Sequence, residues 1–170
     1  GPSPHEVAVS PNGSLAVVTN YGPRGEPGST LTFVDLAEAR TARTIELSHD
    51  GQTYHRPHGL RFTPDGKRLV VTAEAEQAIV VVDVDAEKVT SVIKTGQRIS
   101  HMLDLDAEGE RAFVANIGSG TMTVLDLVKG EKIADVATGD GADGVAVSPD
   151  GKEVWVSNRG ADTVSVLDAG

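Results

Sequence analysis

Short apolar runs separated by turn residues fill the whole chain. Runs of three to six residues rich in Val, Ile and Ala, such as those at 70–73, 79–84 and 154–156, are bounded by Gly, Pro, Asn or Asp. Runs of this length and setting predict β-strands. No segment keeps apolar residues at i, i+3, i+4 and i+7 over the ten or more positions of a typical helix. The pattern therefore predicts an all-β protein.

The predicted strands recur in four copies of one unit. The copies begin PHEVAVSPNG at position 4, PHGLRFTPDG at 57, SHMLDLDAEG at 100 and ADGVAVSPDG at 142. His58 and His101 are 43 residues apart and Asp143 follows after another 42, whereas His5 precedes His58 by 53 because the first copy has longer loops. A period near 40 to 45 residues with several short strands per copy predicts the blades of a β-propeller.

Each copy predicts a four-stranded antiparallel meander. In the second copy, strands are predicted at 59–63, 68–73, 79–84 and 89–95, with Asp-Gly and Asp-Ala at the hairpin turns. The predicted blades cover about 4–48, 57–96, 100–139 and 142–170. The whole chain is thus predicted to be a single propeller segment of four blades.

The fourth copy is incomplete, because the chain stops after its third predicted strand, TVSVLD. An apolar strand left at an open edge is a site for pairing with another strand. We therefore expect either a piece of a longer protein, whose remaining blades continue the ring, or a homodimer joined by blade edges into a ring of about eight blades. A self-closed ring of four blades is the remaining alternative, and it requires steeper packing between blades.

Composition narrows the classes of function. The formal net charge is -10 at pH 7, which disfavours binding to nucleic acid phosphates. No apolar run approaches the roughly 20 residues of a membrane span, so no membrane span is expected. The chain has no cysteine, which excludes disulfides, zinc-thiolate sites and thiol catalysis.

The second predicted strand of each copy carries a recognisable signature. It reads VVTN at 17–20, VVTA at 70–73, FVAN at 113–116 and VWVSN at 154–158, and the turns SPNG, TPDG and SPDG accompany it. Over essentially its whole length the chain resembles the YVTN-type β-propeller repeat family, which includes lactonase-like and surface-layer-associated proteins. The resemblance implies a propeller, usually of about seven blades, and a periplasmic or extracellular location.

One position of the repeat carries candidate metal ligands. His5, His58, His101 and Asp143 each stand at the start of the innermost strand of a blade, where the central channel opens. Three imidazoles and one carboxylate suit a divalent transition metal ion. The alternative is a structural role, in which each ring hydrogen-bonds the backbone of a neighbouring blade.

The second blade places acidic residues on the same face. Glu74 and Glu76 follow its second strand, where the other copies read NYG, NIG and NRG. A carboxylate beside His58 would act as a general base or tune the imidazole, so His58 and Glu74 are the catalytic candidates. A solvated acidic loop is the alternative.

Basic side chains are also predicted on this face. His55, Arg56, Arg98 and Arg159 fall in the loops around the channel mouth, with Tyr54 at its entrance. Guanidinium groups bind carboxylates and phosphates through paired hydrogen bonds. These residues are therefore the candidates for binding a small anionic ligand.

Two function classes follow from these patterns. The first is a binding scaffold that presents loops around a channel to a protein or a small anionic ligand, without catalysis. The alternative is a lactonase-like hydrolase or a metal-dependent enzyme that uses the histidine-lined mouth. The sequence leaves open whether the protein is an enzyme.

Overall fold

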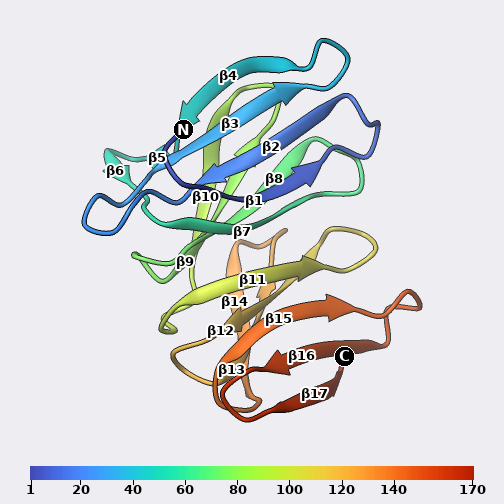
Figure 1. Cartoon of the computed structure of the whole chain (residues 1–170). Helices are drawn as coiled ribbons and strands as arrows, with labels where there is room; N and C mark the ends of the chain where they lie inside the picture. Colours follow the sequence, from blue (N-terminus) through green and yellow to red (C-terminus); the bar gives the residue numbers. More distant parts are fainter.

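The computed structural model describes all residues from 1 to 170 and consists of β-strands joined by turns (Figure 1). The predicted all-β fold is confirmed, and each blade is an antiparallel meander whose strands pair in chain order. No helix is long and apolar enough to cross a membrane.

The strand bounds agree with the repeat. The strands of blade one are β1 (Pro4–Val9), β2 (Leu15–Asn20), β3 (Thr30–Asp35) and β4 (Arg40–Glu46). Those of blade two are β7 (Pro57–Phe62), β8 (Arg68–Ala73), β9 (Ala78–Asp83) and β10 (Lys88–Lys94). Those of blade three are β11 (Ser100–Leu105), β12 (Arg111–Asn116), β13 (Thr121–Asp126) and β14 (Glu131–Ala137). Blade four has only β15 (Ala142–Val147), β16 (Glu153–Asn158) and β17 (Thr163–Asp168).

A small hairpin that the repeat did not predict joins blades one and two. It pairs β5 (Ser48–His49) with β6 (Gln52–Thr53). Asp50 and Gly51 form its two-residue turn, with φ values of 50° and 78°. Two positive φ angles are what a type I′ turn requires, and Asp-Gly is among its preferred sequences.

Tight turns on the face opposite the histidines fix the first hairpin of blades one, two and four. In blade one, Ser10 Oγ lies 2.7 Å from Asn12 Oδ1, and Gly13 has a φ of 70°. The same arrangement joins Thr63 to Asp65 at 2.6 Å and Ser148 to Asp150 at 2.7 Å. A hydrogen bond between the side chains of residues i and i+2 stabilises the backbone of such a turn. The SPNG, TPDG and SPDG sequences therefore specify one turn geometry.

The hydrophobic core lies between neighbouring blades. Phe33 of blade one and Leu60 of blade two belong to one cluster, and Leu103 joins the next cluster, between blades two and three. Phe113 belongs to a third cluster, shared by blades three and four. Because these sheets pack on a neighbour at both faces, strands β8, β9 and β12 of blades two and three are buried over nearly their whole length.

The innermost strands contact one another in the order β1, β7, β11 and β15. Blades one and four lie at opposite ends of the row in Figure 1, so the chain does not close into a ring of four. The order of these strands determines which side chains meet at the mouth of the propeller.

The two end blades expose apolar side chains. Val164 in β17 is 58% exposed and Trp155 in β16 is 46% exposed, while Val7 and Val9 are exposed on β1. The predicted absence of an outer strand in blade four is confirmed, and β17 is left as an unpaired edge. Unpaired apolar edges are usually covered in native proteins.

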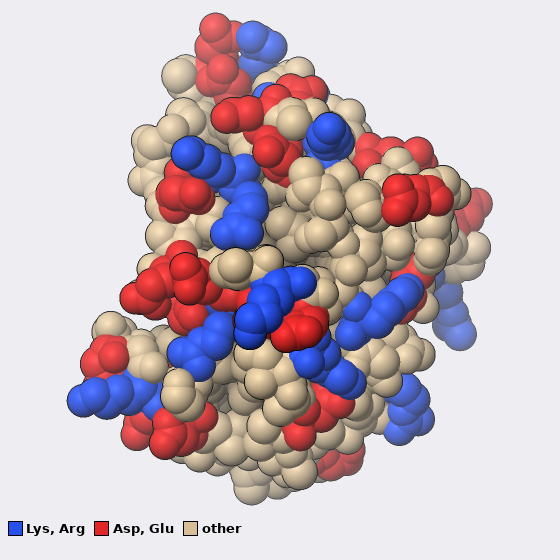
Figure 2. All heavy atoms as spheres, turned by 180° about the vertical axis from the view of Figure 1, so that it is seen from behind, with Lys and Arg blue, Asp and Glu red and all other residues tan.

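Charged side chains of both signs are interspersed on the face shown in Figure 2. Ion pairs also join neighbouring blades: Arg43 Nε lies 2.8 Å from Glu87 Oε1, and Arg61 Nε lies 3.2 Å from Asp104 Oδ1. Part of the surface charge is thus paired between blades.

Candidate functional site

The four predicted entry residues form a row across the innermost strands. His5 lies on β1, His58 on β7, His101 on β11 and Asp143 on β15. The ring centroids of His5 and His58 are 4.0 Å apart, and those of His58 and His101 are 3.7 Å apart. His101 Nε2 lies 3.0 Å from Asp143 Oδ1. The four side chains therefore contact in sequence.

Local backbone geometry directs these side chains. In every blade the pairing of the innermost strand shifts around the entry residue; the shifts fall between Pro4 and Val7, Pro57 and Leu60, Ser100 and Leu103, and Ala142 and Val145. A β-bulge re-aims a side chain relative to a regular strand. The bulge thus explains why a residue at the start of a buried strand reaches the mouth of the propeller.

A second repeat position is tied to the first. The residue before each innermost strand has a positive φ, and these residues are Ser3, Arg56, Ile99 and Gly141. Its carbonyl accepts a hydrogen bond from the backbone N–H of the residue that follows the second strand, at 3.0 to 3.2 Å; these donors are Tyr21, Glu74, Ile117 and Arg159. One backbone bond per blade therefore brings both positions together.

These two positions line one cavity of about 300 Å³. The cavity, called the mouth cavity below, is lined by His5, Tyr21, His58, Glu74, Ile99, His101, Ile117 and Arg159. Comparing the copies identifies the second position, because Tyr21, Ile117 and Arg159 are the middle residues of NYG, NIG and NRG. The loop after the second strand was predicted on this face from Glu74, but no role was predicted for Tyr21.

His101 is held by two carboxylates from different blades. Its Nδ1 lies 2.6 Å from Glu74 Oε1, and its Nε2 lies 3.0 Å from Asp143 Oδ1. Both ring nitrogens of His101 therefore face carboxylate oxygens. Glu74 is thus hydrogen-bonded to His101 rather than to His58, beside which it was predicted.

Glu74 is also fixed by a phenol. Tyr21 Oη donates to Glu74 Oε2 at 2.7 Å. Burial, together with the hydrogen bond and charge of Glu74, raises the pKa of Tyr21 to about 12. The phenol therefore stays protonated at neutral pH and holds the carboxylate in one orientation.

His58 is the most buried residue of the row, with 3% of its surface exposed. Its Nδ1 is buried and has no hydrogen-bond partner in the chain. Burial lowers the pKa of His58 to about 3, with smaller effects from His101 and His5. Its ring is therefore neutral at pH 7, with one nitrogen that the chain leaves unsatisfied.

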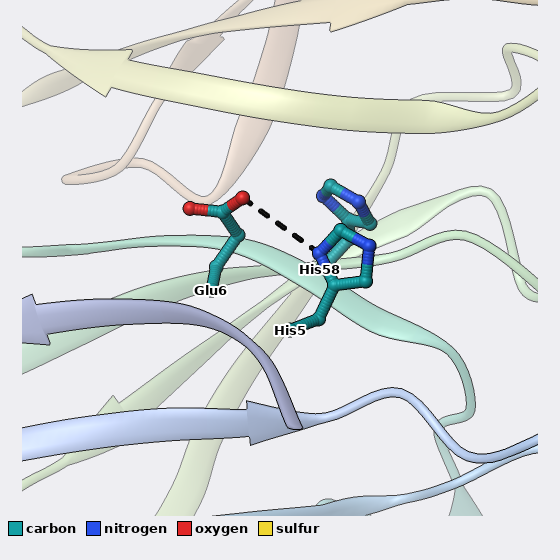
Figure 3. Close-up of side chains that lie close together, drawn as sticks. All are labelled: His5, Glu6 and His58. Carbon is teal, nitrogen blue, oxygen red and sulfur yellow. Dashed lines mark ion pairs between the residues drawn. The ribbon is translucent and has the colours of Figure 1, made fainter. Parts of the chain in front are cut away.

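The candidate ligand atoms fall into two groups. One atom each from His58, Glu74 and His101 lies within 4.8 Å of the other two, and the same holds for His5, Glu6 and His58. Figure 3 shows the second group, in which His5 Nδ1 lies 3.7 Å from Glu6 Oε1. The predicted metal set of three histidines and Asp143 does not converge on one point, because the row is extended and Asp143 lies beyond His101.

The predicted anion-binding residues are dispersed. Only Arg159 lines the mouth cavity, where its Nη1 lies 3.4 Å from Asp143 Oδ2. The Arg56 guanidinium lies 4.7 Å from the centre of the Tyr21 ring, and Arg98 donates to the Gly118 carbonyl. Arg56 and Arg98 are therefore not among the residues that line the cavity.

His55 and Tyr54 lie outside the mouth cavity as well. His55 Nδ1 lies 2.9 Å from Glu76 Oε1, and its backbone N–H donates to Glu76 Oε2 at 2.7 Å. Tyr54 is buried in the core cluster between blades one and two, so its predicted place at the entrance is wrong. Tyr54 directly follows the β5–β6 hairpin, which the repeat did not predict.

The fold and the mouth cavity together define a class: a β-propeller segment with a polar site where its innermost strands begin. The family is shown directly. The chain belongs to the lactonase family of seven-bladed β-propellers, since the family model described as "Lactonase, 7-bladed beta-propeller" matches residues 1–169. The lactonase-like propeller expected from the sequence is thereby confirmed.

Individual relatives agree with this assignment. Hydrazine synthase subunit beta of Kuenenia stuttgartiensis is 26% identical over 96% of this chain and 53% of its own length. A seven-bladed β-propeller protein of Mycobacterium tuberculosis is 30% identical over 65% of this chain and 29% of its own length. The chain thus spans about half, or less, of the curated relatives it matches.

Solved structures show the same relation. Hydrazine synthase of Kuenenia stuttgartiensis superimposes with a TM-score of 0.85 and 25% identity, over 98% of this chain and 46% of that one. A functionally unknown protein from Desulfotomaculum acetoxidans gives a TM-score of 0.75 at 16% identity, over 97% and 55%. The second likeness shows the fold alone.

Proposed function

We propose that this chain is the ligand-binding part of a larger propeller and that it holds a small anionic ligand in the mouth cavity. The observation that supports this most is that equivalent positions of all four blades converge on a single cavity. Concave sites with a few convergent polar groups are the usual binding sites of such folds. A binding function requires only that these side chains contact a ligand, whereas catalysis would also require groups positioned for a chemical step.

Arg159 supports an anion as the ligand. Its guanidinium makes one long contact, with Asp143, and its other N–H groups have no partner in the chain. A carboxylate can accept two parallel hydrogen bonds from such a fork. The exposed ring of His5 lies at the same cavity and supplies a further donor.

The open flanks support completion of the ring by further blades. Because the chain spans about half of the hydrazine synthase subunit, three or so more blades would fit the family's usual number. Alternatively, a second copy of the chain covers the open flank by pairing with the free edge of β17. By family resemblance, we propose a periplasmic or extracellular location.

Titration of the chain with gluconate, followed by calorimetry and by amide NMR shifts, tests the proposed ligand class. Arg159→Gln should weaken binding about tenfold or more, the loss expected for a charged hydrogen bond of about 1.5 kcal/mol. Arg98→Gln is the matched control, because Arg98 lies outside the cavity. Equal losses in both variants, or no shifts at cavity residues, would contradict the proposal.

Lactone hydrolysis is a second candidate, favoured by the short His101–Glu74 pair in a chain of the lactonase family. In this function Glu74 or the free nitrogen of His58 would accept a proton from the attacking water. Hydrolysis of glucono-δ-lactone by the chain should exceed the rate in buffer and fall in Glu74→Gln. A rate equal to that of buffer alone would exclude this candidate for the chain.

A further inference from the structure

We propose that His58, Glu74 and His101 form a binding site for a divalent transition metal ion, with two imidazole nitrogens and one carboxylate oxygen as ligands. One candidate atom from each residue lies within 4.8 Å of the other two. Zinc binds such ligands at about 2.0 to 2.2 Å, so bound ligand atoms lie roughly 3.4 Å apart. Binding therefore requires that the three atoms, already within 4.8 Å of one another, adjust to this spacing.

The unsatisfied nitrogen of His58 is the independent sign of a ligand. Nδ1 of this ring is buried and has no hydrogen-bond partner, and the ring packs against His101 with their centroids 3.7 Å apart. Leaving a buried polar atom unpaired costs about 1 to 3 kcal/mol, and native proteins rarely keep one without a role. A metal ion bound by this ring would satisfy the nitrogen that the chain leaves free.

The other two ligands are already hydrogen-bonded to each other. Glu74 Oε1 and His101 Nδ1 lie 2.6 Å apart, so an ion that enters between them replaces this hydrogen bond. Two histidines and one carboxylate are a known metal-binding set, which leaves one or more positions open for water or another ligand.

Surrounding residues orient these two ligands. Tyr21 donates to the free oxygen of Glu74 at 2.7 Å, and Asp143 Oδ1 lies 3.0 Å from the second nitrogen of His101. A carboxylate behind a ligating histidine, and a donor behind a ligating carboxylate, are the usual supports of metal ligands. Asp143 thus orients a ligand and does not itself bind the ion.

The competing group, His5, Glu6 and His58, lacks such support. His5 and Glu6 are more exposed than Glu74 and His101, with 46% and 34% of their side chains accessible. Their own contact is 3.7 Å long, and neither side chain has a hydrogen-bond partner behind it. Because both groups need His58, they exclude each other, and the better supported one is favoured.

Calorimetric titration of the chain with Zn²⁺ distinguishes the two groups. Wild type should bind one ion, and Glu74→Gln, which keeps the shape of the side chain, should lower the affinity at least tenfold. Glu6→Gln is the matched control and should leave the affinity unchanged. Loss in Glu6→Gln with none in Glu74→Gln, or no loss in either, would overturn the assignment.

Two measurements keep the test decisive if Glu74→Gln does not fold. Tyr21→Phe keeps all three ligands and should lower Zn²⁺ affinity roughly 10- to 100-fold, as removal of an orienting partner does. The zinc K-edge absorption spectrum of the wild-type complex should show two imidazole ligands. Unchanged affinity in Tyr21→Phe, or a spectrum with oxygen ligands only, would overturn the site.

The metal site and the anion site fail separately. Arg159→Gln should lose the response to gluconate yet still bind Zn²⁺, because Arg159 is not a ligand. Zinc binding without any gluconate response would support the metal site and reject the proposed ligand class. A gluconate response without zinc binding would support the anionic ligand and reject the metal site.

Discussion

His101 Nδ1 lies 2.6 Å from Glu74 Oε1, although the two residues belong to different blades. Glu74 follows the second strand of blade two, and His101 begins the innermost strand of blade three. Each blade therefore completes the polar site of its neighbour.

The stability of the chain should depend on pH through His58. The pKa of this ring is about 3 in the folded chain and 6.5 in the unfolded chain, so the unfolded state binds more protons between these values. Stability is then complete above about pH 6.5 and falls as pH drops toward 3, by at most about 1.4 kcal/mol per pH unit.

Urea unfolding of wild type and His58→Gln at pH 7.5, 6, 5 and 4 measures this effect. The difference in unfolding free energy between the two proteins should shrink, or change sign in favour of the variant, as pH falls. A constant difference across the range would contradict a neutral, buried His58.

Removal of the Tyr21 hydroxyl should destabilise the chain. Tyr21→Phe deletes a hydrogen bond to a carboxylate and should cost about 1.5 kcal/mol. Tyr54→Phe is the matched control, because the Tyr54 hydroxyl has no partner in the chain, and it should change stability by less than about 0.5 kcal/mol. Urea unfolding at pH 7.5 measures both, and equal costs would show that the Tyr21–Glu74 bond adds nothing.

Strands β7 and β11 approach each other closely at Gly59. A Cβ at Gly59 would lie 2.7 Å from the His101 carbonyl oxygen and 2.9 Å from Met102 Cα, so β7 and β11 must separate to admit it. Gly59→Ala should therefore cost about 1 to 3 kcal/mol, as overpacking does, and should shift the imidazole NMR signals of His58 and His101.

Gly144 offers the matched control for that substitution. It holds the same repeat position in blade four, where a Cβ would meet only the Ser157 hydroxyl, at 3.0 Å. Thermal unfolding should show a smaller loss for Gly144→Ala than for Gly59→Ala. Equal losses would mean that strand propensity, rather than contact between blades, decides both.

The open edge should drive association of the chain. Val164 is exposed on the edge strand β17, so Val164→Lys should lower the mass measured by light scattering while changing stability by less than about 0.5 kcal/mol. Val128→Lys, at an exposed turn away from this edge, should leave the mass unchanged. If Val164→Lys also leaves it unchanged, edge pairing is not the mechanism.

The sequence by itself determined the blades, because their strands follow from local rules that the four internal copies share: apolar runs between turns, and a period of 40 to 45 residues. It also placed His5, His58 and His101 at one end of the innermost strands. Position within a repeat is a local property, and all four copies carry it in the same register.

Only the tertiary structure decided which side chains meet. Glu74 contacts His101 on one side of its ring, and Asp143 contacts it on the other. Of the predicted arginines, only Arg159 lines the cavity. These contacts depend on the bulge in each innermost strand and on the packing of one blade against the next. Both are set by residues far apart in the chain, so no local pattern specifies them.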